Sequence, residues 1–134
     1  MDEWEYGTPG AAAGQIAVVR AIYDAFARRD LEGALLLMAP DVEMTLQATS
    51  RLAERDGPYV GHAGVRQYFE DATRIWREIT LHAEDIRAAS GSVIVFGHVT
   101  GIVGADAFRR QVMWTWKLRD GLATSIRASD LGSS

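Results

Sequence analysis

The last two fifths of the chain constrain the fold most, because they predict four consecutive β-strands joined by short turns. Runs of alternating apolar residues are separated by turn sequences at Ser90-Gly91, around Gly104 and at Arg119-Asp120-Gly121. Such turn residues between alternating runs are typical of β-hairpins. We therefore expect an antiparallel meander of four strands over Ile79–Ala89, Ser92–Val103, Phe108–Leu118 and Leu122–Asp130.

Three helices and one strand are predicted before the meander. Apolar residues at three- and four-residue spacing predict a helix over residues 15–29 and another that begins near His62. Between them, Asp30 is a suitable cap for a short helix that Pro40 ends, and residues 41–48 alternate as a strand does. This order predicts an α+β domain with helices on one face of an antiparallel sheet.

The remaining segments are predicted to be irregular. Residues 1–14 mix acids, glycines and small residues and are expected to form a flexible tail, with docking through Trp4 and Tyr6 on the body or on a partner subunit as the alternative. The domain is expected to cover residues 15–131, with a short tail over 132–134. Residues 49–58 are polar and close with Gly57-Pro58, so we expect a loop there, a candidate lid over a site.

Composition excludes several classes of function. The 134 residues are 48% hydrophobic, which is enough to build one core without disulfides or metal, and the net charge of −4 offers no basic stripe for nucleic acid. The chain has no cysteine, an acidic start without a signal-peptide pattern and no apolar run long enough to span a bilayer. We therefore expect a cytoplasmic protein that contacts neither nucleic acid nor membrane.

Three stretches carry a family resemblance, AVVRAIYDAFARRDLEGALLLMAPDVEM, YVGHAGVRQYF and MWTWKLRDGLATSIRASD. Their order and spacing resemble the SnoaL-like family of the nuclear transport factor 2-like superfamily, which also contains ketosteroid isomerase and limonene epoxide hydrolase. The resemblance covers about residues 15–131 and implies a cystatin-like cone, a curved antiparallel sheet wrapped around three helices that encloses an apolar pocket. Because this fold hosts both enzymes and non-enzymes, the fold alone does not give the function.

The last hairpin predicts which residues share a face of the sheet. A three-residue turn at 119–121 would make Leu118 and Leu122 the closing pair. Counting outward from that pair predicts four cross-strand pairs on the apolar side, Trp116 with Thr124, Trp114 with Ile126, Val112 with Ala128, and Arg110 with Asp130.

The pair of Arg110 and Asp130 is the sharpest chemical feature of the sequence. A carboxylate held by an arginine can act as a general base or orient a water, and the arginine can stabilise developing charge on oxygen. The alternative is an ion pair that only satisfies both charges at the end of the sheet. By resemblance, Asp130 matches an aspartate near the end of the last strand in SnoaL-type polyketide cyclases. Tyr23 is the third catalytic candidate, with a role in the core as its alternative.

By resemblance the apolar side of the hairpin is the concave face that lines the pocket. The predicted ligand-binding residues are Trp114, Trp116, Tyr68, Phe69, Met38, Leu46, Ile126 and Val112, together with His62 at the mouth. A place in the core is the alternative for each apolar residue, and helix capping or exposure is the alternative for His62. The lining suits an apolar or aromatic ligand.

Departures from two relatives argue against their activities. Limonene epoxide hydrolases place an arginine between two carboxylates, whereas the residue two after Arg110 is Val112. Ketosteroid isomerases carry a base, a tyrosine and an acid at the positions that hold Leu46, Ile22 and Trp114 here. The sequence therefore supports neither epoxide hydrolysis nor steroid isomerisation.

No cofactor or metal is expected, since the three histidines lack the paired spacing of a metal site and no glycine-rich loop follows a strand. Two functions remain open. The first is a cofactor-independent cyclase, isomerase or dehydratase that performs acid-base chemistry on a small hydrophobic or aromatic molecule. The second is a non-catalytic ligand-binding or interaction domain. A homodimer is expected through the outer sheet face, with contacts from Phe96, His98, Val103 and Phe108.

Overall fold

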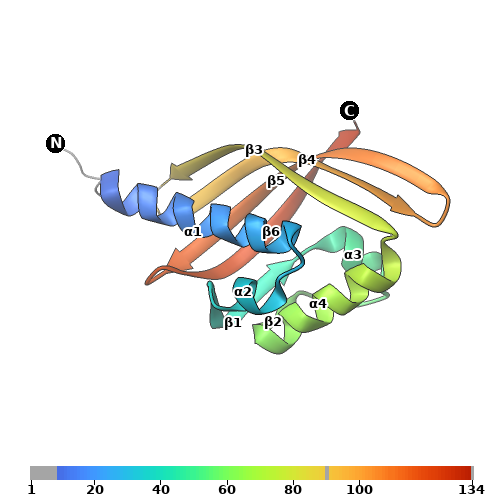
Figure 1. The fold of residues 1–134 in the computed structure, drawn as a ribbon, viewed down its shortest axis with the longest axis horizontal. Helices are drawn as coiled ribbons and strands as arrows, with labels where there is room; N and C mark the ends of the chain where they lie inside the picture. Colours follow the sequence, from blue (N-terminus) through green and yellow to red (C-terminus); the bar gives the residue numbers. More distant parts are fainter. Residues whose placement is uncertain (1–8, 90, 134) are drawn as a thin grey trace.

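The computed structural model describes residues 9–89 and 91–133, which form one curved sheet with helices on its concave side (Figure 1). The strand order is β2-β1-β6-β5-β4-β3. Each strand of the C-terminal part pairs antiparallel with the next, so the predicted meander is confirmed. Its strands are β3 Glu78–Ala89, β4 Ser92–Val103, β5 Asp106–Arg119 and β6 Leu122–Ser133. Because β6 continues to Ser133, residues 132 and 133 belong to a strand and not to the expected C-terminal tail.

The sheet is mixed rather than wholly antiparallel. β1, Met38–Thr45, pairs parallel with β6 and antiparallel with the two-residue β2, Tyr59–Val60. A parallel neighbour requires a long connection, which here runs over residues 46–121 and includes two helices, β2 and three strands of the meander. β1 also begins earlier than the expected residue 41, so that Pro40 lies in this strand instead of ending a helix.

The first two helices meet at a tight corner. α1 is Pro9–Ala27, so residues 9–14 are helical rather than part of a flexible tail, while residues 1–8 of that expected tail lie outside the described residues. α2 is Leu31–Leu35, shorter than expected. Its predicted cap is confirmed, since Asp30 Oδ1 accepts a hydrogen bond of 2.9 Å from the backbone N–H of Gly33.

A short helix replaces the start of the expected loop. α3 covers Gln47–Leu52, and α4 covers Gly61–Ile75, close to its predicted start. The described residues thus hold four helices instead of the three expected. None of these helices is long and apolar enough to cross a membrane.

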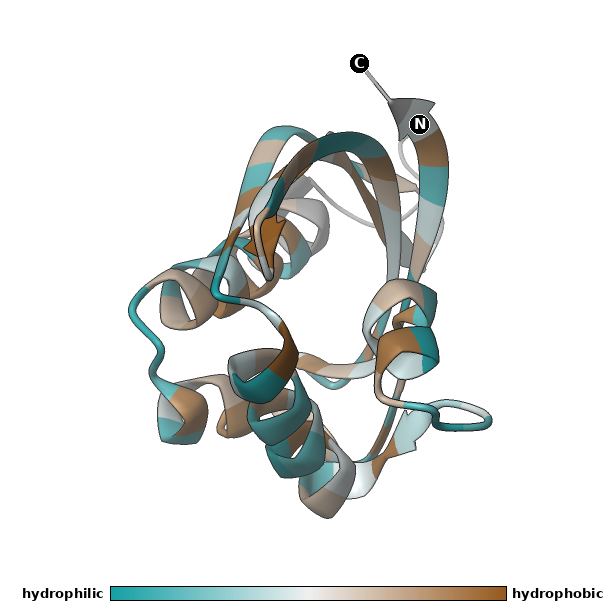
Figure 2. Cartoon of the chain, turned by 90° about the vertical axis from the view of Figure 1, so that its right-hand side faces the viewer, coloured by the Kyte–Doolittle hydropathy of each residue, from teal (hydrophilic) through white to brown (hydrophobic). Residues whose placement is uncertain are grey.

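The core fills the space between the concave face and the helices, as expected for an α+β domain. Figure 2 shows the sheet as an arch with helices on its open side. Side chains from every layer are fully buried there, among them Val19 and Ile22 of α1, Val65 of α4 and Trp116 of β5. Burial of this apolar surface is the main free energy that holds the helices on the sheet.

The convex face presents fewer apolar side chains. Phe96 is 40% exposed, and the buried ring of His98 stacks on His82 with ring centroids 4.1 Å apart. Both residues were expected on this face. Phe108, also expected there, instead lies on the concave side and packs on Trp76, because it follows the same alternation as Val112 and Trp114. Val103 likewise alternates onto the concave side with Val99.

The outermost strand, β3, is interrupted by a bulge. The pairing with β4 shifts between Ala83 and Asp85, which leaves Glu84 as the extra residue. The strands approach closely here, since a Cβ atom added to Gly97 would lie 1.8 Å from the carbonyl oxygen of His82. Gly97 is therefore required by the bulge.

The buried carboxylate of Asp71 joins α4 to the segment that follows α3. Asp71 is 1% exposed and accepts hydrogen bonds from Arg55, from the Tyr59 hydroxyl at 2.8 Å, from Gln67 at 3.0 Å and from Arg74 at 3.2 Å. The hydrogen bond from the Arg55 guanidinium is the largest of the effects that hold the pKa of this carboxyl well below its usual range. The network fixes residues 53–58 and β2 against α4.

We expect Asp71→Asn to lower the free energy of unfolding by about 2 kcal/mol, because the amide loses charge-assisted hydrogen bonds. Urea denaturation at neutral pH measures the change. Asp85→Asn is the matched control, since Asp85 pairs with Arg87 on the exposed surface and the exchange should cost about 0.5 kcal/mol or less.

The same variant should show a pH dependence. Because the pKa of Asp71 is lower in the folded state than in the unfolded state, its stabilisation is complete above the unfolded pKa of about 4 and is lost as the pH falls further. The difference in stability between wild type and Asp71→Asn should therefore shrink below about pH 4. An equal difference at every pH would contradict this assignment.

Candidate functional site

An apolar cavity of about 160 Å³ lies between the concave face of the sheet, α1 and α3, and we call it the Trp114 cavity. Its charged lining residues are Arg51, Arg110 and Asp130. The other lining residues are mostly apolar or aromatic and come from α1, β1, the α3 segment, α4 and the sheet: Tyr23, Phe26, Met44, Leu46, Gln47, Ala48, Thr49, Tyr68, Trp76, Ile79, Leu81, Val99, Phe108, Val112, Trp114, Ile126 and Ala128.

Strand β5 supplies one wall of this cavity through simple alternation. Phe108, Arg110, Val112 and Trp114 all line it, because every second residue of a strand faces the same side. The next residue in this series, Trp116, is fully buried and lies outside the lining. The wall therefore changes along one strand from solid core to cavity to charged rim.

The rim holds the predicted ion pair. Arg110 Nη2 donates to Asp130 Oδ2 at 2.8 Å, and Arg110 Nε lies 3.1 and 3.3 Å from the two carboxylate oxygens. The backbone N–H of Gly132 donates to Asp130 Oδ1 at 2.8 Å. The side chains are 42% and 55% exposed, respectively, so this pair lies at the cavity mouth and is not buried.

The register of the last hairpin differs from the prediction by two residues. The turn is a two-residue Asp120-Gly121 turn with both φ values positive, closed by Arg119 and Leu122, and a bulge follows it. As a result, Trp116 lies opposite Ile126, Trp114 opposite Ala128 and Val112 opposite Asp130. A second bulge between Gln111 and Val112 shifts the last pair by one more residue, so Arg110 lies opposite Ser133. A shift of two residues leaves each side chain on its predicted face, so Arg110 reaches Asp130 along the diagonal.

The pKa of Asp130 is lowered. The main cause is the hydrogen bond from Arg110, followed by the hydrogen bond from the Gly132 backbone, and the positive charge of Arg51 adds to both. Asp130 is therefore ionised at neutral pH and accepts hydrogen bonds in that state.

Tyr23 lies inside the cavity with a fixed hydroxyl group. The hydroxyl oxygen accepts a hydrogen bond of 3.2 Å from the indole nitrogen of Trp116, and the ring makes edge contacts with Trp114 and Trp116. Burial raises the pKa of Tyr23 strongly, so its hydroxyl stays neutral. It can thus donate a hydrogen bond to a ligand oxygen but cannot serve as a base near neutral pH.

The predicted ligand-binding residues divide into three groups. Five of them line the Trp114 cavity, namely Trp114, Tyr68, Leu46, Ile126 and Val112. Phe69 lines a second, neighbouring cavity. The other three lie elsewhere, since Trp116 and Met38 are buried in the core, and the ring of His62 lies 3.0 Å from the Met38 carbonyl oxygen.

The sequence analysis did not predict that residues of α3 line the cavity. Gln47, Ala48, Thr49 and Arg51 line the cavity, although residues 49–58 were expected to be a loop. The expectation that this segment covers the site is nevertheless consistent with its place in the lining. The indole nitrogen of Trp76 donates to Thr49 Oγ1 at 3.0 Å, which holds α3 against the end of α4.

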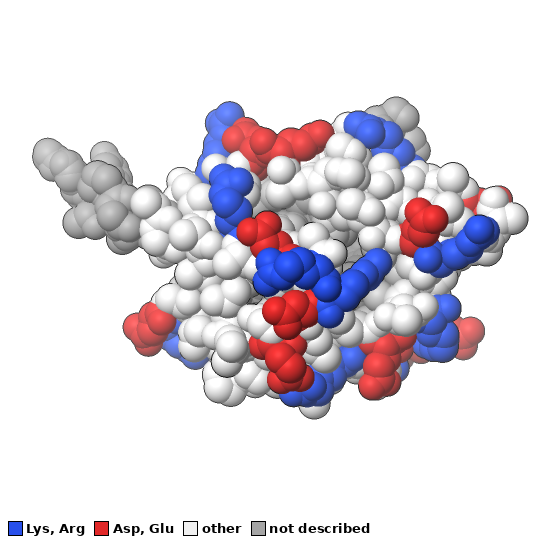
Figure 3. All heavy atoms as spheres, in the orientation of Figure 1, with Lys and Arg blue, Asp and Glu red and all other residues white. Residues whose placement is uncertain are grey.

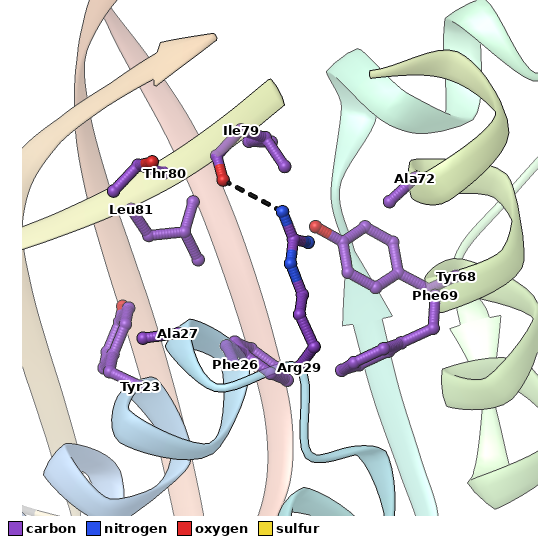
Figure 4. A pocket seen from close by; sticks show the side chains of 10 residues that line it. All are labelled: Tyr23, Phe26, Ala27, Arg29, Tyr68, Phe69, Ala72, Ile79, Thr80 and Leu81. Atoms are coloured by element: carbon purple, nitrogen blue, oxygen red, sulfur yellow. Dashed lines mark hydrogen bonds between the residues drawn. The ribbon is translucent and has the colours of Figure 1, made fainter. Parts of the chain in front are cut away.

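The second cavity, which we call the Arg29 cavity, has a volume of about 180 Å³ and lies at the end of α1. Figure 4 shows Arg29 reaching from the corner after α1 towards β3. Tyr23, Phe26, Tyr68, Ile79 and Leu81 line both cavities, so the two share a wall. Within residues 9–89 and 91–133, no group of three or more histidine, aspartate or glutamate side chains could hold a metal ion.

A family model described as the SnoaL-like domain matches residues 19–126. The chain belongs to the SnoaL-like domain family. No curated protein matches this SnoaL-like chain significantly. Among solved structures, it is similar to an NTF2-like protein of unknown function from Burkholderia pseudomallei, with 23% identity and a TM-score of 0.80 over 87% of this chain and 90% of that chain.

Two further structures extend the likeness. TerC, co-crystallised with polyporic acid, is 25% identical with a TM-score of 0.78, covering 87% of this chain and 91% of that one. An LEH-like epoxide hydrolase from M. tuberculosis is 14% identical with a TM-score of 0.72, covering 90% and 84%. These likenesses confirm the cystatin-like, NTF2-like fold that the sequence predicted.

The geometry of the rim predicts a measurable titration. We expect the Asp130 carboxyl to titrate below the usual aspartate value near 3.9, and Arg110→Gln to raise its pKa towards that value, because the main stabilising hydrogen bond is lost. Carboxyl-carbon NMR across an acid titration measures both. Arg119→Gln, which removes a charge from the exposed end of the same strand, should leave the Asp130 pKa unchanged. An unchanged pKa in Arg110→Gln would refute the pairing.

Proposed function

We propose that this SnoaL-like protein binds a small hydrophobic or aromatic molecule in the Trp114 cavity and performs cofactor-independent acid-base chemistry on it. The observation that carries the proposal is the position of the Arg110–Asp130 pair at the mouth of an otherwise apolar cavity. Pockets of this kind, apolar with a few convergent polar groups, are typical small-molecule sites. The likeness to TerC, which was crystallised with polyporic acid, supports a ring-bearing ligand.

The proposed chemistry begins with proton transfer to Asp130. Its carboxylate would take a proton from a carbon next to a ligand carbonyl, and the electron pair of the broken C–H bond would form an enolate. The Arg110 guanidinium would stabilise negative charge at the mouth. Return of the proton to another carbon gives an isomerase. Attack of the enolate carbon on a second carbonyl, with the proton passed to the new alkoxide, gives a cyclase, and expulsion of a hydroxyl group as water gives a dehydratase.

Tyr23 would orient the ligand from inside the cavity. Its hydroxyl accepts from Trp116, which leaves its own hydrogen for a ligand oxygen. Since this hydroxyl stays neutral, it is assigned to binding and not to proton abstraction.

One observation favours the second candidate, a ligand-binding domain without catalysis. Asp130 is 55% exposed and its pKa is lowered, and a carboxylate of low pKa is a weak base. The two candidates predict the same ligand but different consequences for Asp130, so one variant separates them.

We expect a thermal-shift screen of hydrophobic ketones, polyketide-like aromatics and polyporic acid to identify a ligand that stabilises the wild type. Asp130→Asn should keep binding within about threefold, because the amide is isosteric, but should lose turnover by at least about 100-fold, the usual contribution of a general base. Product analysis by mass spectrometry and NMR of the incubated ligand measures turnover.

Two controls sharpen the result. Asp106→Asn removes a carboxylate from the start of the same strand β5 and should change neither binding nor turnover. Ala128→Leu places a larger side chain in the cavity and should abolish ligand stabilisation. Binding without turnover in the wild type selects the binding domain, and a complete absence of ligand stabilisation across the screen refutes both candidates.

We further propose a homodimer through the convex face of the sheet. Phe96, 40% exposed near the middle of β4, has Met113 of β5 as its cross-strand neighbour, and an apolar side chain at this place suits contact with a second copy. Phe96→Glu should halve the mass measured by sedimentation equilibrium, because it places a charge in that contact. Leu36→Glu, at an apolar residue 79% exposed on the helical side, should leave the mass unchanged. A monomeric wild type would contradict the proposal.

A further inference from the structure

The Arg29 cavity has the features of a site for an organic anion. Arg29 supplies the positive charge of its lining, and none of the described residues that line it is acidic. Phe26, Phe69 and Leu81 make much of the remainder apolar. Figure 3 shows a hollow near the centre of this side of the molecule, with basic and acidic side chains around it. A cation beside an apolar cavity attracts an anion that carries a hydrophobic group.

The guanidinium of Arg29 is weakly engaged. Within residues 9–89 and 91–133 it makes one hydrogen bond, from Nη2 to the Ile79 carbonyl oxygen at a long 3.4 Å, although a guanidinium can donate five. The adjacent Arg28, by contrast, lies 3.6 Å from the carboxylate of Asp30. Arg29 is thus the arginine of this corner whose charge is available to a ligand.

A second donor lies beside the guanidinium. Figure 4 shows the Tyr68 hydroxyl directed towards Arg29 across the cavity. Burial raises the pKa of Tyr68 to about 12, so its hydroxyl remains protonated near neutral pH. A neutral hydroxyl directed towards a guanidinium in the lining of one cavity lets both groups donate to the oxygens of one carboxylate.

The backbone of Arg29 supports a role outside folding. Its φ of +58° lies in the left-handed region, at the turn that ends α1, where the N–H groups of Arg29 and Asp30 bond back to Phe26 and Ala25. Glycine is the favoured residue at such a position, and a residue with a side chain is strained there. A strained residue whose side chain reaches a cavity points to a function of that side chain.

The two cavities together suit one elongated ligand. A cavity of about 150 Å³ holds a single benzene ring, so the Trp114 cavity at about 160 Å³ has room for about one ring. The Arg29 cavity adds about 180 Å³ beside it, and Tyr23, Phe26 and Tyr68 border both cavities. We propose that the ligand is an amphipathic organic anion whose carboxylate binds Arg29 and Tyr68, and whose apolar part passes the bordering residues and places one ring in the Trp114 cavity. This inference rests on the proposed function of the Trp114 cavity.

The experiment compares 4-phenylbenzoate with its neutral amide, 4-phenylbenzamide, by isothermal titration calorimetry. The affinity for the amide measures the contribution of the apolar cavity. The difference in affinity between the two probes measures the contribution of the Arg29 charge. We expect the wild type to bind the carboxylate at least about tenfold more tightly than the amide, a difference that falls with added salt because it is electrostatic.

Arg29→Gly is the decisive variant, since glycine fits the left-handed backbone and should preserve or raise the melting temperature. It should weaken 4-phenylbenzoate about tenfold and leave the amide unchanged. Arg28→Gly removes the same charge from the neighbouring residue and should leave both affinities unchanged.

Each other outcome has a defined meaning. Equal binding of carboxylate and amide, or equal weakening by the Arg28 and Arg29 variants, overturns the anion site and leaves the proposed function standing. If neither probe binds the wild type, this inference fails for its ligand class, and the separate screen with Ala128→Leu decides the proposed function.

Discussion

The burial of one carboxylate organises the parts that cover the cavity. Asp71 would be costly to bury alone, because a charge removed from water needs compensating partners. Its donors come from α4 itself, from the segment after α3 and from the start of β2. The same network therefore fixes the return of the chain from α3 to the sheet edge. With Trp76 bonded to Thr49, it keeps α3 over the mouth where Arg110 and Asp130 meet.

Much of the architecture could be predicted because its signals are local and periodic. The meander follows from alternation and turn residues, and the Asp30 cap follows from a side chain three residues before its partner. The side of the sheet on which each residue of the last hairpin lies was also predicted correctly, although the turn was assigned incorrectly. A strand repeats every two residues, so a shift of two changes the cross-strand partner and preserves the side.

Other features have no local signal. The parallel pairing of β1 with β6 joins segments separated by most of the domain, and neither segment records the direction of the other. The helix α3, with the sequence QATSRL, is too short and polar to show a helical stripe. Trp116 and Met38 are buried in the core because of how α1 and α2 pack on the sheet. The sequence predicts that a residue faces inward, but it does not predict whether that residue lies in the core or lines the cavity. The place of Arg29 in a cavity lining also has no local signal, because an arginine in a polar corner resembles any surface residue.

The bulge in β3 affects the tendency of this protein to aggregate through the edge of its sheet at high concentration. β3 is an edge strand of twelve residues, and the backbone groups on the unpaired side of an edge strand are a template for further strands. The extra residue at Glu84 breaks the regular spacing of backbone donors and acceptors, and Asp85 and Arg87 place charges beside the break. A flat strand from another molecule could therefore form backbone hydrogen bonds with only part of β3, because the bulge interrupts the regular pairing. A bulge and charged side chains on an edge strand are features that disfavour the addition of further strands, so β3 is a natural border of this sheet.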